Sequence, residues 1–232
     1  MKWEDLYKRA YVPYSGKQDA CVVLGSEGGF YVGVRIENVS FPLTISCVQA
    51  ACSISLSYGE NPKTIYVNSN DEPQLKYWAQ EFDCDILVGE LPANLNLANY
   101  SEQAGIEKVP ILKKLLDYAV AGNSNFPVSA IISSDSGHYT GVNIEVSDWA
   151  KGLCAERVAL CKAIADGVKT FQSLSVHTLK GEFSSPCGAC RQVLFEHLPL
   201  SKAELYHANG TYSEHFILDL LPFSFTSKDL FS

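Results

Sequence analysis

The sequence predicts an α/β protein made of two related halves, each with a mixed sheet flanked by helices. Short runs rich in Val and Ile alternate with segments whose apolar residues recur at helical spacing, which is typical of layered α/β domains. A degenerate internal repeat divides the 232 residues into halves that are each about the size of a domain. The predicted domains are residues 1–100 and residues 101–232.

The repeat is clearest in two pairs of short motifs. Residues 33–37 (GVRIE) recur as residues 141–145 (GVNIE), at an offset of about 108 residues. A cysteine follows the glycine of each motif, Cys47 after fourteen residues and Cys154 after thirteen. The alignment therefore pairs Cys47 with Cys154 and places one insertion or deletion between the two copies.

The elements of the second half follow from its turn residues and its apolar spacing. Residues 126–133 are largely apolar and predict a strand, which the turn at residues 135–137 joins to a second strand at 138–145. Residues 152–166 carry apolar side chains at helical spacing and end before Gly167, so they predict a helix.

The remaining elements of this half complete the α/β alternation. Residues 171–178 alternate as a strand does, and residues 203–208 predict a further strand before an Asn-Gly turn. Ser185 and Pro186 indicate the start of a helix that runs to about His197, with the proline at its first helical position.

Composition and charge exclude several classes of function. The net charge of −8 and the lack of clustered Lys and Arg argue against nucleic acid as a partner. No apolar run is long enough to span a membrane, so we expect no membrane association. The N-terminus has no apolar signal core, which favours a cytoplasmic protein whose eight cysteines are reduced thiols.

Three of these cysteines and one carboxylate have the spacing of a catalytic metal site. Cys154 is followed two residues later by Glu156, and Cys187 and Cys190 form a Cys-x-x-Cys motif after a proline. Three protein ligands leave one position of tetrahedral zinc for water, whose pKa the metal lowers. The pattern predicts one Zn²⁺ per chain, held by the three thiolates, with Glu156 as the proton carrier.

Two alternatives concern the metal. A closed structural site needs a fourth ligand, for which Cys161, His177 and His197 are the formal candidates. Cys161 lies about 10.5 Å from Cys154 along a helix, too far for both sulfurs to bind one ion. Thiolates favour zinc over hard cations but leave iron open. Arg157 and Arg191 each follow a ligand cysteine, and hydrogen bonds from them to sulfur are expected to draw charge off the thiolates.

The first half lacks the same chemistry. In the sequence alignment it has Gln49 where the second half has Glu156, and an amide cannot carry a proton. It has no Cys-x-x-Cys motif, since Cys84 stands alone. Cys47 and Cys52 are therefore interpreted as small buried apolar residues. The first half is predicted to be non-catalytic.

These motifs resemble the cytidine deaminase family, in its class with three Cys ligands. Cys-Ala-Glu at 154–156 and Pro-Cys-Gly-Ala-Cys-Arg-Gln at 186–192 carry the resemblance, strongly over residues 120–226 and weakly over 5–95. Phe-Pro-Val at 126–128 and Asn-Ile-Glu at 143–145 resemble the free-nucleoside members. The resemblance implies two tandem deaminase domains and hydrolysis of cytidine or deoxycytidine to uridine or deoxyuridine and ammonia, as in pyrimidine salvage.

The resemblance also implies roles for individual residues. Asn143 and Glu145 match the pair that binds the ribose hydroxyls, and Phe126 matches the aromatic beside the nucleoside. The Ala155 backbone matches a contact to the pyrimidine, and Glu156 matches the acid/base. The plainer alternative is that the first two are polar residues at a strand end and that Phe126 belongs to the core.

A partner is implied as well. One-domain members of the family are tetramers that build each site from neighbouring subunits. Phe41 and Phe225 match aromatics that reach across those interfaces, so we expect a homodimer of two-domain chains that imitates the tetramer. Other hypotheses are deamination of a related pyrimidine or nucleotide, polynucleotide editing and a non-catalytic zinc scaffold. The sequence leaves open the ribose or deoxyribose preference and which chain supplies each aromatic.

Overall fold

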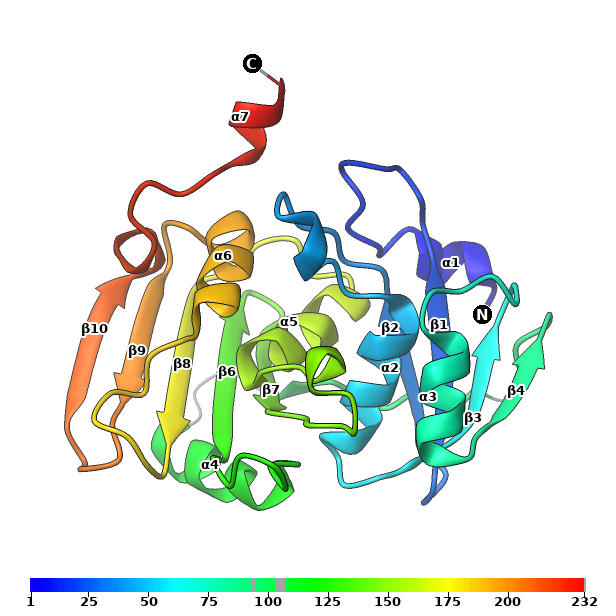
Figure 1. Ribbon diagram of the computed structural model, residues 1–232, viewed down its shortest axis with the longest axis horizontal. Helices are drawn as coiled ribbons and strands as arrows, with labels where there is room; N and C mark the ends of the chain where they lie inside the picture. The colour runs from blue at the N-terminus through cyan, green and yellow to red at the C-terminus, as the bar shows by residue number, and fades with distance from the viewer. Residues whose placement is uncertain (93–94, 103–106, 232) are drawn as a thin grey trace.

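The computed structural model describes residues 1–92, 95–102 and 107–231 and arranges them as two sheets with helices between and around them (Figure 1). The predicted fold class is confirmed, because both sheets are mixed and both are flanked by helices. Helices α2 (Cys47–Leu56) and α5 (Ala155–Ala165) pack against each other in the centre, and α5 also contacts the sheet of the first half.

The first half forms a four-stranded sheet in the order β2-β1-β3-β4. Strand β1 is antiparallel to β2 and β3, and β3 is parallel to β4. The strands are β1 (Ala20–Gly25), β2 (Phe30–Val34), β3 (Pro62–Val67) and β4 (Asp85–Val88), and the other helices are α1 (Trp3–Tyr7), α3 (Leu75–Phe82) and the short 3₁₀ helix η1 (Phe41–Leu43).

The second half forms a six-stranded sheet in the order β10-β9-β8-β6-β7-β5. Strand β6 is antiparallel to β7 and β8, and β8 is parallel to β9, as β3 is to β4. The strands are β5 (Ser101–Glu102), β6 (Val128–Ser134), β7 (Gly137–Val142), β8 (Ser173–Thr178), β9 (Lys202–Tyr206) and β10 (Tyr212–Phe216).

The other helices of this half are α4 (Lys108–Leu115), α6 (Gly188–His197), α7 (Ser227–Phe231) and the 3₁₀ helices η2 (Leu116–Tyr118), η3 (Trp149–Lys151) and η4 (Ile217–Leu220). Helix α7 stands away from the body of the protein (Figure 1). Along the chain, β4 is the last strand of the first sheet and β5 is the first strand of the second. The proposed boundary after residue 100 lies between them. Within the described residues, no helix has the length and apolar character needed to cross a membrane.

Several predicted boundaries need correction. Helix α5 begins at Ala155 and not at residue 152, because Cys154 is its N-cap. Helix α6 begins at Gly188, not at Pro186, because Cys187 is its N-cap and accepts a hydrogen bond on Sγ from the Cys190 backbone N–H at 3.5 Å. Strand β7 ends at Val142, so Asn143 and Glu145 lie beyond the strand. All eight cysteines are free thiols, as predicted.

The repeated glycines have a shared packing role. A Cβ on Gly33 would lie 2.3 Å from the Cys47 carbonyl oxygen and 2.3 Å from the Ala51 nitrogen. A Cβ on Gly141 would lie 2.2 Å from the Ala155 carbonyl oxygen and similarly close to the following turn. In each half the central helix therefore lies directly on the backbone of the strand, which only glycine permits.

These contacts correct the alignment of the two halves. Gly33 faces Cys47 as Gly141 faces Ala155, so the structural counterpart of Cys47 is Ala155 and not Cys154. Helix α2 has Ser46 as its N-cap, in the place that Cys154 takes in α5.

The extra residue lies in a hairpin turn instead. Five residues separate the paired Leu24 and Phe30, and four separate the paired Ser133 and His138. From Phe30 and His138 onward to the central helices, the residue numbers of matching positions differ by a constant 108 (138 − 30). Glu156 therefore corresponds to Val48 and not to Gln49, which corresponds to Arg157. The first half keeps neither the first thiol nor the acid of the predicted site.

Candidate active site

The three predicted thiols meet where two helices begin. Cys154 is the N-cap of α5, Cys187 is the N-cap of α6, and Cys190 is the third residue of α6. Their Sγ atoms all lie within 4.8 Å of one another, and those of Cys154 and Cys187 are 3.7 Å apart. Tetrahedral zinc with Zn–S bonds of about 2.3 Å requires sulfurs roughly 3.8 Å apart, so the thiols are spaced for one such ion.

The arrangement is that of an open site. Among the described residues, the cluster of ligand atoms contains the three thiols and no fourth His, Cys or carboxylate. The alternatives Cys161, His177 and His197 thus stay outside it. Both helix N-termini favour negative charge, which suits thiolate ligands.

The thiols share their protons unequally when no metal is present. Hydrogen bonds from Cys154 and Cys190 lower the pKa of the Cys187 thiol well below its usual range. The pKa values of Cys154 and Cys190 are raised, first because of the hydrogen bonds within the cluster and then because of burial. Three sulfurs so close together are a donor set that a soft divalent cation fits.

Glu156 lies beside this cluster with an unpaired carboxylate oxygen. Its side chain is 3% exposed, and its Oε2 is buried without a hydrogen-bond partner. Burial raises the pKa of Glu156 above its ordinary value, and the neighbouring Cys187 raises it further. A buried carboxyl with a raised pKa and a free oxygen is suited to proton transfer. The unpaired oxygen is also consistent with a metal site, because a water molecule held by the metal would give it a hydrogen-bond partner.

The two arginines differ from each other. Burial would lower the pKa of Arg157, but the Cys190 and Cys154 sulfurs, together with a hydrogen bond to Cys154, raise it. Arg157 thus faces the cluster. Arg191 does not donate to sulfur in any contact the structure records. Its guanidinium donates to the Pro186 carbonyl oxygen at 2.8 Å, to Ser185 Oγ at 2.7 Å and to the Leu220 carbonyl oxygen. It holds the loop that carries Cys187.

A cavity of about 610 Å³ opens beside the thiols, a size typical of small-molecule sites. Seven of the predicted site residues line it: Phe126, Asn143, Glu145, Cys154, Glu156, Arg157 and Cys187. Trp149, Ala150, Thr178, Phe183 and Ser185 also line it, and sequence reasoning missed them. Trp149 lies five residues before Cys154, and an aromatic so close to the metal motif was the available signal.

Asn143 and Glu145 are engaged in local hydrogen bonds. Asn143 Oδ1 accepts from the Val128 N–H at 2.8 Å, and its Nδ2 donates to the Phe126 carbonyl oxygen at 3.1 Å. Glu145 accepts from the backbone N–H groups of residues 123 and 124 and from the Ser124 hydroxyl. Each side chain keeps spare capacity, since an amide and a carboxylate can make several bonds.

The first half makes the same carboxylate contact. Glu37 accepts from the backbone N–H groups of Tyr14 and Ser15 and from the Ser15 hydroxyl, as Glu145 does from residues 123 and 124. Because a half without the metal site keeps this contact, Glu145 has a structural task besides any role in binding. Asn143 corresponds to Arg35, so this member of the pair differs between the halves.

Five predicted residues are not among the described residues that line the cavity: Cys190, which belongs to the thiol cluster, Arg191, Ala155, Phe41 and Phe225. Ala155 is fully buried under β7. Phe41, on η1, is 83% exposed, and Phe225 is 49% exposed near α6, where its carbonyl oxygen accepts from Gln192. Within one chain these two aromatics do not reach the thiols.

The fold and the site together define an α/β protein with a zinc-binding region in its C-terminal half. Residues 106–200 match the family described as the cytidine and deoxycytidylate deaminase zinc-binding region. The cytidine deaminase of Sporosarcina psychrophila is 40% identical over 51% of this chain and 88% of that protein. That of Halalkalibacterium halodurans is 36% identical over 46% of this chain and 83% of that protein.

Two solved structures are also similar to part of this chain. The crystal structure of cytidine deaminase from Burkholderia pseudomallei is 33% identical, covering 50% of this chain and 95% of that chain with a TM-score of 0.48. The structure of the Mycobacterium tuberculosis cytidine deaminase is 31% identical, with the same coverage and a TM-score of 0.41. On the sequence matches, the chain belongs to the cytidine deaminase family.

Proposed function

We propose that this protein hydrolyses cytidine or deoxycytidine to uridine or deoxyuridine and ammonia, with one Zn²⁺ in its C-terminal half. The observation that carries the proposal is the unpaired, buried oxygen of Glu156 beside three thiols at the wall of a cavity. A structural zinc site does not need such a carboxyl, and leaving one buried without a partner is costly.

Each residue of the centre has a proposed task. Cys154, Cys187 and Cys190 would hold the metal, which when bound supplies a water molecule of lowered pKa. Glu156 would take a proton from the attacking water and deliver it to the ring nitrogen as the new C–O bond forms. It would then take a second proton from the new hydroxyl and deliver it to the amino group, which leaves as ammonia when the C–N bond breaks. Arg157 offsets the negative charge of three thiolates.

The cavity would bind the nucleoside. Phe126 and Trp149 offer aromatic surfaces, and Asn143 and Glu145 offer polar groups for the sugar hydroxyls. The hydrogen bonds of Asn143 to residues 126 and 128 would couple the sugar contact to the aromatic wall. The Ala155 backbone is proposed to contact the pyrimidine only if the start of α5 becomes accessible on binding.

We further propose a homodimer, in a cytoplasmic role in pyrimidine salvage. Several large apolar side chains are exposed in the single chain: Phe41 at 83%, Leu200 at 79% and Phe223 fully. Such surfaces are commonly covered by a partner. Phe41 and Phe225 would then complete a site from a second chain. An active monomer in analytical ultracentrifugation contradicts this.

The test of the function is an absorbance assay with cytidine, deoxycytidine, dCMP and cytosine. We expect turnover of a nucleoside, and a loss of about 10²–10⁴-fold in kcat for Glu156→Gln with zinc content unchanged. Glu60→Gln is the matched control, because Glu60 lies in the first half and binds Tyr31. Turnover of none of the four compounds by the zinc-loaded protein would sink the proposal.

A further inference from the structure

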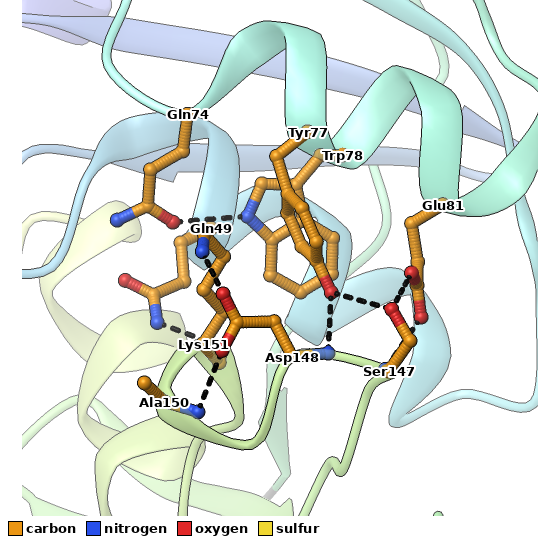
Figure 2. A network of polar contacts seen from close by, with 9 residues as sticks. All are labelled: Gln49, Gln74, Tyr77, Trp78, Glu81, Ser147, Asp148, Ala150 and Lys151. Carbon is orange, nitrogen blue, oxygen red and sulfur yellow. Dashed lines mark hydrogen bonds and ion pairs between the residues drawn. The ribbon is translucent and has the colours of Figure 1, made fainter.

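The first half holds a different cluster at the place that matches the metal centre. Counted from the helix N-caps, Gln74 on α3 corresponds to Cys187 and Tyr77 to Cys190, while Gln49 on α2 corresponds to Arg157. Tyr77 and Gln49 bond to residues 147–151 of the second half, which we call the wall segment, while Gln74 accepts a hydrogen bond from Trp78 on its own helix (Figure 2). The place that matches the metal centre is thus in contact with a piece of the second half.

The start of the wall segment is bound by α3. Glu81 accepts from the Ser147 backbone N–H at 2.7 Å and from the Ser147 hydroxyl (Figure 2). The Tyr77 hydroxyl accepts from the Asp148 N–H at 3.1 Å and lies 3.3 Å from Ser147 Oγ. Burial opposes ionisation of Glu81, but the bonds from Ser147 outweigh it and lower its pKa. Glu81 is therefore an ionised acceptor at neutral pH.

The end of the wall segment is bound as well. The Lys151 carbonyl oxygen accepts from Gln49 Nε2 at 2.9 Å, and the Lys151 ammonium lies 4.5 Å from the centre of the Tyr77 ring. The same ammonium pairs with Asp148, whose carboxylate also accepts from the Ala150 N–H at 3.1 Å. The segment is thus closed on itself and fixed to the first half at both ends.

The middle of the same segment is a wall of the catalytic cavity. Trp149 and Ala150 line it, and the Trp149 side chain is 65% exposed. An indole so exposed is held mainly by its backbone, and that backbone is held by Tyr77, Glu81 and Gln49.

We propose that the first half has exchanged its metal site for a clamp that positions Trp149 against the bound substrate. Tyr77 and Glu81 are the positioning residues, acting through Ser147 and Asp148. The proposal rests on the proposed function for the identity of the substrate, but not for the contact itself. The non-catalytic half then contributes to substrate affinity and leaves the chemistry at Glu156 untouched.

The experiment compares Tyr77→Phe and Glu81→Gln with the wild-type protein. Each variant removes or weakens hydrogen bonds to the wall segment, and Tyr77→Phe keeps the aromatic ring that the Lys151 ammonium contacts. We expect KM for the nucleoside to rise roughly threefold to tenfold, the worth of one or two hydrogen bonds, with kcat and zinc content unchanged. In a Trp149→Ala background the same changes should leave KM unaltered, because the indole that they position is gone.

Matched controls come from the same half. The Tyr31 hydroxyl donates a hydrogen bond of 2.6 Å to Glu60, and among the described residues neither of the two bonds to the wall segment. Tyr31→Phe and Glu60→Gln should therefore leave KM unchanged. Labelling with 5-fluorotryptophan gives a second readout without turnover. The ¹⁹F resonance of Trp149, assigned with Trp149→Phe, should shift in the clamp variants and stay in the controls.

The outcomes separate the two proposals. A wild-type protein that turns over no pyrimidine overturns the proposed function, and the ¹⁹F resonance then decides the clamp alone. An unchanged resonance in folded Tyr77→Phe and Glu81→Gln overturns the clamp. So does a rise in KM of the same size with and without Trp149.

Discussion

Helices α2 and α5 occupy matching positions, yet they begin differently. Ser46 caps α2 in the usual way, its hydroxyl accepting from the Gln49 N–H at 3.1 Å. Cys154 caps α5 without any side-chain bond to the helix, and its sulfur is turned to Cys187 instead. A serine cap is worth about 1 kcal/mol. The comparison teaches that the fold forms with or without the metal site. In the second half, the residue at the N-cap position of α5 serves the metal site in place of capping the helix.

The strongest test of this comparison is to give α5 the residue that α2 has. Cys154→Ser should abolish zinc binding and reduce kcat by more than about 10³-fold, because three ligands become two. The free energy of unfolding of the metal-free variant should equal or slightly exceed that of the metal-free wild type, since the new hydroxyl can cap the helix. Zinc analysis, the deamination assay and urea unfolding with a chelator measure the three effects.

The matched control is Ser46→Ala in the first half. It should lower the free energy of unfolding by about 0.5–2 kcal/mol and leave zinc content and kcat unchanged. If Ser46→Ala removed zinc, or if Cys154→Ser kept it, the two helix starts would not have the separate tasks assigned to them.

The paired glycines should show what the halves share. Gly33→Ala and Gly141→Ala each place a Cβ within 2.3 Å of helix backbone, so each should destabilise by about 1–3 kcal/mol or more. Only Gly141→Ala should also weaken zinc binding, because α5 carries Cys154 and α2 carries no ligand. Urea unfolding and zinc titration measure this. Equal zinc affinity in both variants would show that α5 adjusts without disturbing the thiols.

A smaller effect is expected at Lys162, where the halves meet. Its side chain is 1% exposed, and its ammonium lies 4.0 Å from the centre of the Tyr58 ring of the first half. Burial lowers the pKa of Lys162 to about 7, against a small opposing effect of Glu102. Below pH 7 the folded state bears the full cost of a buried charge. Between pH 7 and the unfolded pKa of about 10.4 the unfolded chain holds one more proton, so stability rises with pH.

Lys162→Met removes this dependence. The difference in free energy of unfolding between wild type and variant should change by up to about 1.4 kcal/mol per pH unit across that window, in favour of the variant at low pH. Other titrating groups cancel in the difference. Parallel stability curves from pH 7 to pH 10 would mean that Lys162 keeps an ordinary pKa.

The sequence predicted the layered fold and the metal thiols well, for a physical reason. Apolar periodicity and turn residues are local signals, and a zinc motif is defined by spacing along two helix starts. The alignment of the halves was wrong at Cys47 because an extra residue in a hairpin turn leaves no local mark. The start of α6 was placed too early because a proline next to a cap resembles a proline inside the first turn.

By itself the sequence determined the family, the α/β class and the four residues of the candidate centre, since these depend on residue type and short-range spacing. Only the tertiary structure decided what the first half does. Gln49, Tyr77 and Glu81 lie far from residues 147–151 in the chain and meet them only when the two halves pack. A contact of that kind depends on the packing of whole helices, and no motif along the chain encodes it.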